Sequence, residues 1–164
     1  MKKILFAASE CVPFIKTGGL ADVVGSLPKC FDKEKYDVRV MIPNYMCIDH
    51  KWKEKMTYVD HFYMDLCWRR QYVGIMEMEY EGVKFYFIDN EQYFGRPGLY
   101  GYDDDYERFA FFDFAVLELI SHLNIKPDVL QLNDWQTAMI AMLYKERYCY
   151  YDYYQNIKLV FTIH

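Results

Sequence analysis

Lys16, Gly18 and Gly19 have the types and spacing to bind an anionic ligand. They lie between an apolar run at residues 4–8 and an amphipathic segment, an order that predicts a strand, a glycine-rich loop and a helix. The first N–H groups of a helix are unpaired and carry partial positive charge. Glycines let a ligand approach that backbone, and a lysine adds a full charge. The sequence therefore indicates a phosphate or diphosphate site, although a plain strand-to-helix turn with a solvated lysine has the same pattern.

The loop differs from the two best-known nucleotide-binding loops. It lacks the Gly-Lys-Ser/Thr of a Walker loop, and it lacks the three-glycine spacing of a dinucleotide-binding loop. Asp22, one turn into the expected helix, is a further candidate for substrate binding. An acidic residue at that position also favours the helix dipole, so a purely structural role stays open.

A βαβ unit must position this loop. Residues 2–8 are apolar on both faces, as expected for a strand in a covered parallel sheet. Residues 38–42 give a second strand, and such units build a doubly wound α/β fold. Between the two strands, apolar residues recur at helical spacing, which predicts one buried stripe: Leu20, Val23, Val24 and Leu27.

The middle of the chain predicts a β-rich insertion followed by a long helix. Three segments are strand-like: 58–65, 71–80 and 83–88. Glu81 and Gly82 make a hairpin turn plausible between the last two, and we expect the last strand to rejoin the main sheet. A loop at 90–101 then leads to a helix over 105–124, whose apolar stripe is Phe109, Phe112, Val116, Leu119, Ile120 and Leu123.

Two further strands bring other polar residues to the edge that carries the loop. Residues 129–132 and 158–163 are expected to be buried strands, followed by Asp134 and His164. Ligands of open α/β sheets bind outside the carboxyl ends of the strands. We therefore expect Lys16 and the glycines, Asp134 and His164 to form one site. A helix cap for Asp134 and an ordinary strand-end position for His164 are the structural alternatives.

Composition excludes several classes of protein. The chain has 164 residues, within the one-domain range, and its 19 basic and 24 acidic side chains give a formal net charge of −5. This balance is unlike the basic footprint of a nucleic-acid-binding protein. No apolar segment reaches transmembrane length and no signal-peptide pattern is present. We expect a cytoplasmic protein with neither nucleic acid nor membrane as a partner.

Cysteines and tyrosines are expected to serve packing. The five cysteines are widely spaced with no Cys-x-x-Cys, which favours free thiols over a metal site. The tyrosines clustered at residues 148–154 suit sugar stacking, but a tyrosine-rich surface or a packing seam explains them more simply.

The acidic triplet Asp103, Asp104 and Asp105 offers a metal alternative. Some glycosyltransferases hold Mn²⁺ or Mg²⁺ on an Asp-x-Asp pair, because hard cations prefer carboxylate oxygens. This triplet, however, precedes a long helix, where charge and capping account for it. We expect no metal and no other cofactor.

Several motifs in order carry a resemblance to one family. They are residues 9–10, 13–14, 16–23, 96–101, 107–109, 134–138 and 161–164. Together they resemble the N-terminal region of bacterial glycogen synthases and plant starch synthases, over essentially the whole chain. Because the chain stops on a core strand, we expect residues 1–164 to be the N-terminal domain of a longer protein.

The resemblance implies a fold and a reaction. The fold is the Rossmann-like half of a two-domain GT-B glycosyltransferase, with a mainly parallel sheet. The reaction is the retaining transfer of glucose from ADP-glucose to the non-reducing end of an α-1,4-glucan, so both substrates are the implied partners. Further phosphate-binding cations and a glutamate would lie in the second domain.

The resemblance also implies roles for individual residues. Lys16 and the backbone of the two glycines would contact the sugar nucleotide near its phosphates, and His164 would contact the transferred glucose. Asp134 matches an active-site aspartate, and Tyr100 lies in a loop near the cleft. The catalytic candidates are thus His164 and Asp134, and the substrate-binding candidates are Lys16, Gly18, Gly19, Asp22 and Tyr100.

One departure from the family pattern leaves alternatives open. The family usually has histidines where this chain has Asn133 and Gln136. Neither replacement titrates near neutral pH, which argues against proton transfer by these flanking residues. Another GT-B enzyme that uses UDP-glucose, such as a sucrose-type synthase, and a non-catalytic α/β binding domain are the alternative functions.

Overall fold

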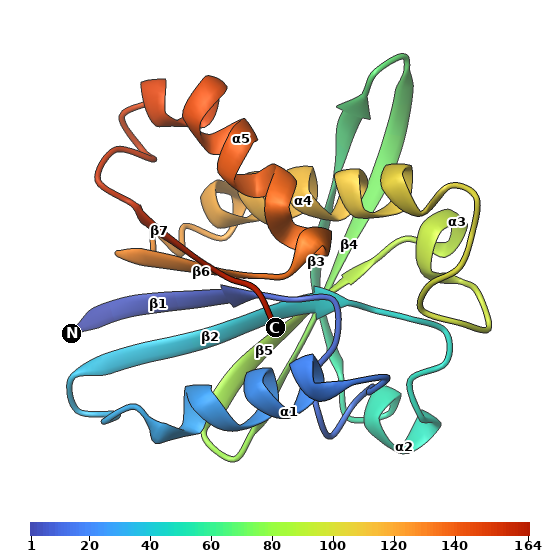
Figure 1. The fold of residues 1–164 in the computed structure, drawn as a ribbon, viewed down its shortest axis with the longest axis horizontal. Coiled ribbons are helices and arrows are strands. Elements are labelled where there is room, and N and C mark those ends of the chain that lie inside the picture. Colours follow the sequence, from blue (N-terminus) through green and yellow to red (C-terminus); the bar gives the residue numbers. More distant parts are fainter.

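The computed structural model describes residues 1–164 as a seven-stranded sheet with helices on both faces (Figure 1). The strands are β1 (Lys2–Ala7), β2 (Tyr36–Pro43), β3 (Thr57–Leu66), β4 (Arg69–Tyr80), β5 (Val83–Asp89), β6 (Val129–Asn133) and β7 (Lys158–Thr162). The α-helices are α1 (Gly19–Ser26), α2 (His50–Lys53), α3 (Glu91–Phe94), α4 (Asp105–His122) and α5 (Ala138–Glu146). Three short 3₁₀ helices are η1 (Leu27–Cys30), η2 (Trp135–Thr137) and η3 (Tyr148–Tyr150).

The strand order β3-β4-β5-β2-β1-β6-β7 confirms the predicted doubly wound fold. Strands β5, β2, β1, β6 and β7 are mutually parallel, whereas β3 and β4 join β5 as an antiparallel extension. The predicted turn at Glu81 and Gly82 connects β4 to β5, with positive φ at both residues. From β1 the chain moves to β2 on one side and later to β6 on the other. The switch point of the topology is therefore the gap between β1 and β6.

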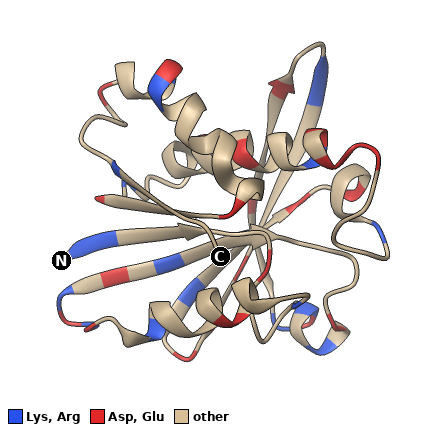
Figure 2. Ribbon diagram, in the orientation of Figure 1, with Lys and Arg blue, Asp and Glu red and all other residues tan.

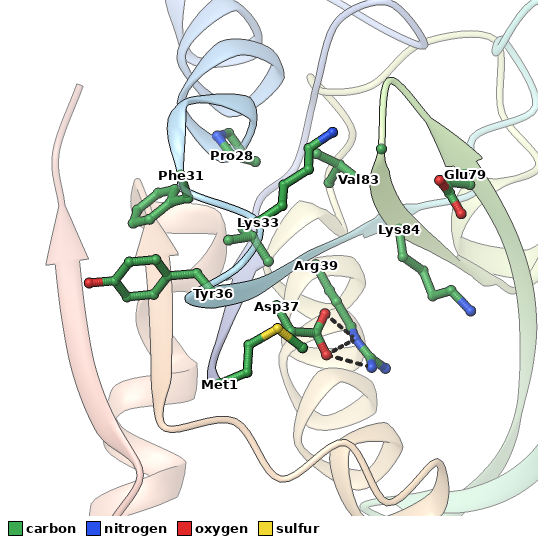
Figure 3. A pocket seen from close by; sticks show the side chains of 12 residues that line it. Met1, Pro28, Phe31, Lys33, Tyr36, Asp37, Arg39, Glu79, Val83 and Lys84 are labelled. Carbon is green, nitrogen blue, oxygen red and sulfur yellow. Dashed lines mark hydrogen bonds and ion pairs between the residues drawn. The ribbon is translucent and has the colours of Figure 1, made fainter.

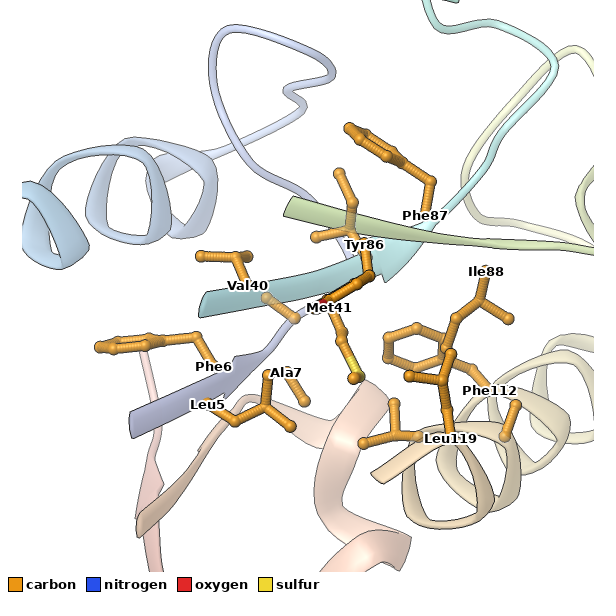
Figure 4. Packing of buried hydrophobic residues seen from close by; sticks show 14 of the residues in the cluster. Leu5, Phe6, Ala7, Val40, Met41, Tyr86, Phe87, Ile88, Phe112 and Leu119 are labelled. Atoms are coloured by element: carbon orange, nitrogen blue, oxygen red, sulfur yellow. The ribbon is translucent and has the colours of Figure 1, made fainter. Parts of the chain in front are cut away.

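The core lies on both faces of the central strands because side chains alternate along each strand. Phe6, Val40 and Phe87 point toward the α1 face, and Met41 and Ile88 point toward α4, as Figure 4 shows. From α4, Phe112 and Leu119 pack against this second face (Figure 4). Five of the six predicted stripe residues of α4 are buried, whereas Leu123 is partly buried and follows the end of the helix at His122. The helix is also buried further round than expected, because Arg108 and Asp113 are buried.

The buried face of α1 differs from the predicted stripe. Leu20 and Val24 are buried as expected, but Val23 and Leu27 are 36% and 43% exposed. The buried face of α1 consists of Leu20, Ala21, Val24 and Gly25. The small residues are buried because α1 lies directly on the loop that follows β1, where Val12 N–H donates to the Ala21 carbonyl.

This close approach makes Gly25 a packing requirement. A Cβ on Gly25 would lie 2.2 Å from Val12 Cγ2 and 2.6 Å from the Val12 carbonyl oxygen. We expect Gly25→Ala to destabilise the protein, since overpacking costs about 1–3 kcal/mol and opposes the ~1 kcal/mol that alanine gains over glycine in a helix. Urea denaturation measures the difference. Gly19→Ala is the matched control in the same helix, because its Cβ meets nothing within 4 Å; equal stability of the two variants would contradict the prediction.

Strand β7 is not buried as the sequence predicts. It pairs with β6 alone, at the edge of the sheet, and Val160 and Phe161 are 45% and 42% exposed. An apolar run is compatible with a covered strand, but it contains no information on which neighbours are present.

The tyrosine cluster combines a packing seam with an exposed surface, as expected, because Tyr150 and Tyr151 are 74% and 56% exposed. Tyr148 and Tyr154 are buried, and Tyr154 donates to the Leu117 carbonyl of α4 at 2.6 Å. All five cysteines are free thiols, also as expected. None of the helices combines the length and the apolar composition that crossing a membrane requires.

Candidate active site at the carboxyl edge of the sheet

A cavity of about 240 Å³ opens at the carboxyl edge of the parallel strands, where the switch point predicts a ligand. It is lined by the loop before α1, the loop before α4, the η2 segment and the last residue: Glu10, Thr17, Gly18, Gly19, Leu20, Tyr100, Asp134, Gln136 and His164. The predicted convergence of distant segments is present. Lys16 and Asp22, by contrast, do not line this cavity.

Glu10 holds the shape of the glycine loop. Its buried carboxylate accepts hydrogen bonds from Thr17 N at 2.8 Å, from Thr17 Oγ1 at 2.6 Å and from Gly18 N at 3.2 Å. The sequence analysis gave this glutamate no role. Because two N–H groups of the loop are bound internally, the N–H groups available to a ligand are those at the start of α1, which no side chain caps.

The two glycines leave open space over the start of α1. Gly18 has an extended backbone, with φ −150°, that any residue can adopt, so its conformation does not require glycine. A Cβ on Gly18 would lie 3.8 Å from Glu10 Oε1, an ordinary contact, and a Cβ on Gly19 would meet nothing. The fold itself therefore tolerates side chains here. Because neither the backbone conformation nor packing requires glycine at these two positions, we infer that the glycines leave room for a ligand.

A methyl group at Gly19 is expected to affect binding and not folding. Gly19→Ala should keep or slightly raise the unfolding temperature, because alanine favours the helix. The same methyl group would enter the space expected for the sugar nucleotide, so the KM for that substrate in the complete protein should rise about tenfold, an effect of roughly 1.4 kcal/mol. Steady-state kinetics measures this change, and an unaltered KM would contradict ligand approach at Gly19.

Lys16 and Asp22 form an ion pair beside the cavity. Lys16 Nζ donates to both carboxylate oxygens of Asp22, at 2.8 and 2.7 Å. Both side chains are about half exposed, so the pair contributes little to stability. Asp22 thus holds the lysine on the outer side of the loop. Two of the three N–H groups of the Lys16 ammonium can thus be taken up by Asp22, which leaves one for an anion bound beside the loop.

Asp134 and His164 are linked at the ends of β6 and β7. The backbone N–H of His164 donates to Asp134 Oδ1 at 2.7 Å. The Asp134 side chain makes no capping bond to η2, so the helix-cap alternative does not describe it. Its backbone has φ 60°, a conformation that non-glycine residues rarely adopt. Such strain at a pocket residue is typical of functional sites.

Asn133 orients the histidine. It is buried, its amide nitrogen donates to the Ala7 carbonyl at 3.0 Å, and its Oδ1 lies 3.1 Å from His164 Nε2. These contacts join the ends of β1, β6 and β7 around one side chain. Asparagine at this position therefore has a positioning role, which needs no titration near neutral pH.

Tyr100 reaches the cavity because a buried arginine holds its loop. Tyr100 Oη lies 2.7 Å from Ser9 Oγ, and burial raises the pKa of the phenol. Arg108, fully buried on α4, donates to the carbonyls of Tyr93 and Leu99 and to Asp105. The region expected to be a loop over 90–101 contains the short helix α3, whose N-cap Asn90 accepts from Tyr93 N. The anchoring role of Arg108 was not predicted.

The acidic triplet contributes to the same structural network. Arg96 pairs with both carboxylate oxygens of Asp104, which lowers the pKa of that carboxyl group. Asp105 accepts from Arg108 at 2.6 Å and from Gly101 N at 2.8 Å. Two of the three aspartates, Asp104 and Asp105, therefore have structural partners.

A second cavity, of about 270 Å³, opens at the opposite, amino end of the strands (Figure 3). Basic residues, blue in Figure 2, lie in the first parts of β1, β2 and β5, near this cavity. Two of its three basic side chains are in ion pairs: Arg39 pairs with Asp37 at 2.7 Å, as Figure 3 shows, and Lys84 pairs with Glu77 at 3.3 Å. The third, Lys33, donates to the Glu81 carbonyl at 3.2 Å. The location at the amino end of the strands argues against a ligand site here.

The model of the starch synthase catalytic domain family matches residues 3–164. The chain belongs to this family. Among curated starch synthase relatives, a glycogen synthase of Lachnospira eligens is 57% identical and one of Lachnoclostridium phytofermentans is 53% identical, each over 165 residues and 100% of this chain. The chain spans 34% of the length of each relative.

A solved structure of the starch synthase family has the same fold. The catalytic domain of starch synthase IV from Arabidopsis thaliana, bound to ADP and acarbose, aligns with a TM-score of 0.88 and 29% identity. The alignment covers 99% of this chain and 34% of the plant chain. This match and the strand order together confirm the predicted α/β fold of a GT-B glycosyltransferase.

Proposed function

We propose that residues 1–164 are the N-terminal domain of a glycogen synthase that transfers glucose from ADP-glucose to the non-reducing end of an α-1,4-glucan, with retention of configuration, in the cytoplasm. The observation that carries the proposal is the convergence of Gly19, Asp134 and His164 on one cavity at the switch point, in a chain of the starch synthase catalytic domain family. The plant relative, solved with ADP and acarbose, supports a nucleoside diphosphate and an oligosaccharide as ligands.

The two parts of the site suit the two parts of a sugar nucleotide. Cleavage of the glucosyl–phosphate bond builds negative charge on the diphosphate, which unpaired N–H groups at the start of α1 stabilise, with Lys16 beside them. The cavity, which this helix start lines on one side, has no lysine or arginine in its lining. It therefore suits the uncharged glucosyl group, with His164 and Asp134 facing the reacting carbon.

The complete protein tests the donor and the reaction together. Incubation with glycogen and either ADP-glucose or UDP-glucose should give elongation that strongly favours ADP-glucose. Preference for UDP-glucose would select the alternative GT-B enzyme, and inactivity with both donors would select a non-catalytic binding domain. Proton NMR of the product reports the anomeric configuration of the new linkage.

The isolated residues 1–164 are expected to show negligible synthase activity. The leaving diphosphate needs more positive charge than the α1 terminus and one paired lysine supply, and a second domain is expected to provide it. Assay of this chain alone and of the complete protein at equal concentration measures the difference. Glucan elongation by the isolated chain at a rate comparable to that of the complete protein would overturn this division of the site.

A further inference from the structure

Gln136 is an unexplained polar residue within the candidate site. It lies in η2, two residues after Asp134, and it lines the cavity although only 6% of its surface is exposed. Its carbonyl oxygen Oε1 is buried and has no hydrogen-bond partner in the protein. Buried polar groups are nearly always bonded, so an orphan of this kind calls for a specific explanation.

The neighbouring polar residues show that the segment is otherwise fully bonded. Asn133 uses both ends of its amide, on the Ala7 carbonyl and on His164. Thr137 Oγ1 accepts from Asn133 N at 2.7 Å and donates to the Asn133 carbonyl at 2.9 Å. Side-chain atoms of five other residues are also buried without partners, but none of these residues lines the cavity. Gln136 is therefore the one residue of this set that lines a space for a ligand.

The unbonded side-chain oxygen of Gln136 indicates which kind of ligand group the amide would bind. A carbonyl oxygen needs a hydrogen-bond donor, which a phosphate near neutral pH does not offer and a sugar hydroxyl does. The carboxylate of Asp134 in the same lining is likewise an acceptor. The lining also contains the hydroxyls of Thr17 and Tyr100 and no lysine or arginine, and such a mixture of donors and acceptors matches a polyhydroxylated, uncharged ring.

We propose that the Gln136 amide hydrogen-bonds a hydroxyl of the transferred glucose and so contributes to the choice of sugar. This inference rests on the proposed function, because it assigns a substrate group to a residue of that site. A site built to bond a hydroxyl discriminates strongly against an analogue that lacks it, since the buried polar group is then left unpaired. Gln136 is thus a specificity-determining residue that needs no change of protonation.

Two variants of the complete protein separate hydrogen bonding from packing. Gln136→Leu keeps similar volume and removes the amide, and we expect kcat/KM for ADP-glucose to fall at least tenfold with an unchanged unfolding temperature. Gln136→His retains a group that donates and accepts, and its kcat/KM should stay within about threefold of the parent value. Gln155→Leu, at an exposed position, is the matched control and should behave as the parent.

A panel of ADP-deoxyglucose donors locates the hydroxyl. With the parent protein, one analogue should lose at least tenfold more rate than it loses with Gln136→Leu, because the leucine variant no longer has the partner of that hydroxyl. Equal penalties for every analogue in both proteins would overturn the proposal. So would a leucine variant within twofold of the parent, or equal impairment by leucine and histidine. An inactive parent protein refutes instead the proposed function, which keeps the two failures distinct.

Discussion

Replacing Asp134 with asparagine is expected to lower kcat of the complete protein by about 100- to 1000-fold, the range seen when one electrostatic contact to a transition state is removed. Glycosyl transfer passes through a state with positive charge on the sugar ring. The Asp134 carboxylate lines the cavity proposed for that ring, so we expect it to stabilise the charge as it develops. Asparagine keeps the oxygen that accepts from His164 N and removes only the charge.

Asp134→Asn should change kcat without changing the stability of the protein. Because the bond to His164 N survives, the unfolding temperature should stay near that of the parent, and steady-state kinetics reports the loss in kcat. Asp128→Asn is the matched control, since Asp128 lies before β6 and accepts from Lys3 N at 2.7 Å, away from the cavity. A parental kcat in Asp134→Asn would show that this carboxylate does not act on the reacting group.

Replacing Arg108 with alanine is expected to destabilise the protein by about 3–5 kcal/mol, as is typical when one partner of a buried ion pair is removed. The change leaves Asp105 without its cation and leaves the carbonyls of Tyr93 and Leu99 unbonded. It also empties the space that a fully buried side chain fills. Equilibrium urea denaturation measures the loss.

Arg96→Ala is the matched control for Arg108. Arg96 lies in the loop that Arg108 anchors, and it pairs with Asp104, but its side chain is 22% exposed. Water can replace its contacts, so we expect a loss of only about 1 kcal/mol. Similar losses for the two variants would refute the view that burial gives Arg108 its importance. Because Arg108 also fixes the residue next to Tyr100, any folded Arg108→Ala protein should bind the sugar nucleotide more weakly.

The elements of the fold were predictable because their patterns are local. Apolar runs at residues 38–42 and 129–132 gave β2 and β6, and the periodicity of α4 gave its buried stripe. The rule for open α/β sheets then placed Asp134 and His164 at one edge, and the shared cavity confirms their proximity. The position of a residue after a strand was sufficient for that step.

Contacts between distant segments were not predictable from these patterns. Glu10 and Arg108 both use a charged side chain to bind backbone groups of loops, and periodicity contains no information on such partners. Helical spacing alone cannot show that Val23 is exposed, since its position fits the predicted apolar stripe. The side of α1 that turns inward is decided instead by the close packing of Gly25 on Val12. Likewise, the role of Asn133 became clear only when Ala7 and His164 were seen beside it.

The three hydrogen bonds of Glu10 bear on how the site binds its ligand. They hold residues 17 and 18 in place without any ligand, so the glycine loop is preorganised. A preorganised loop loses little conformational entropy on binding, and more of the contact energy then contributes to affinity. In the proposed two-domain protein, the entropic cost of assembling the site should therefore arise mainly from bringing the second domain over the sugar nucleotide. Ordering the loop should add little to it.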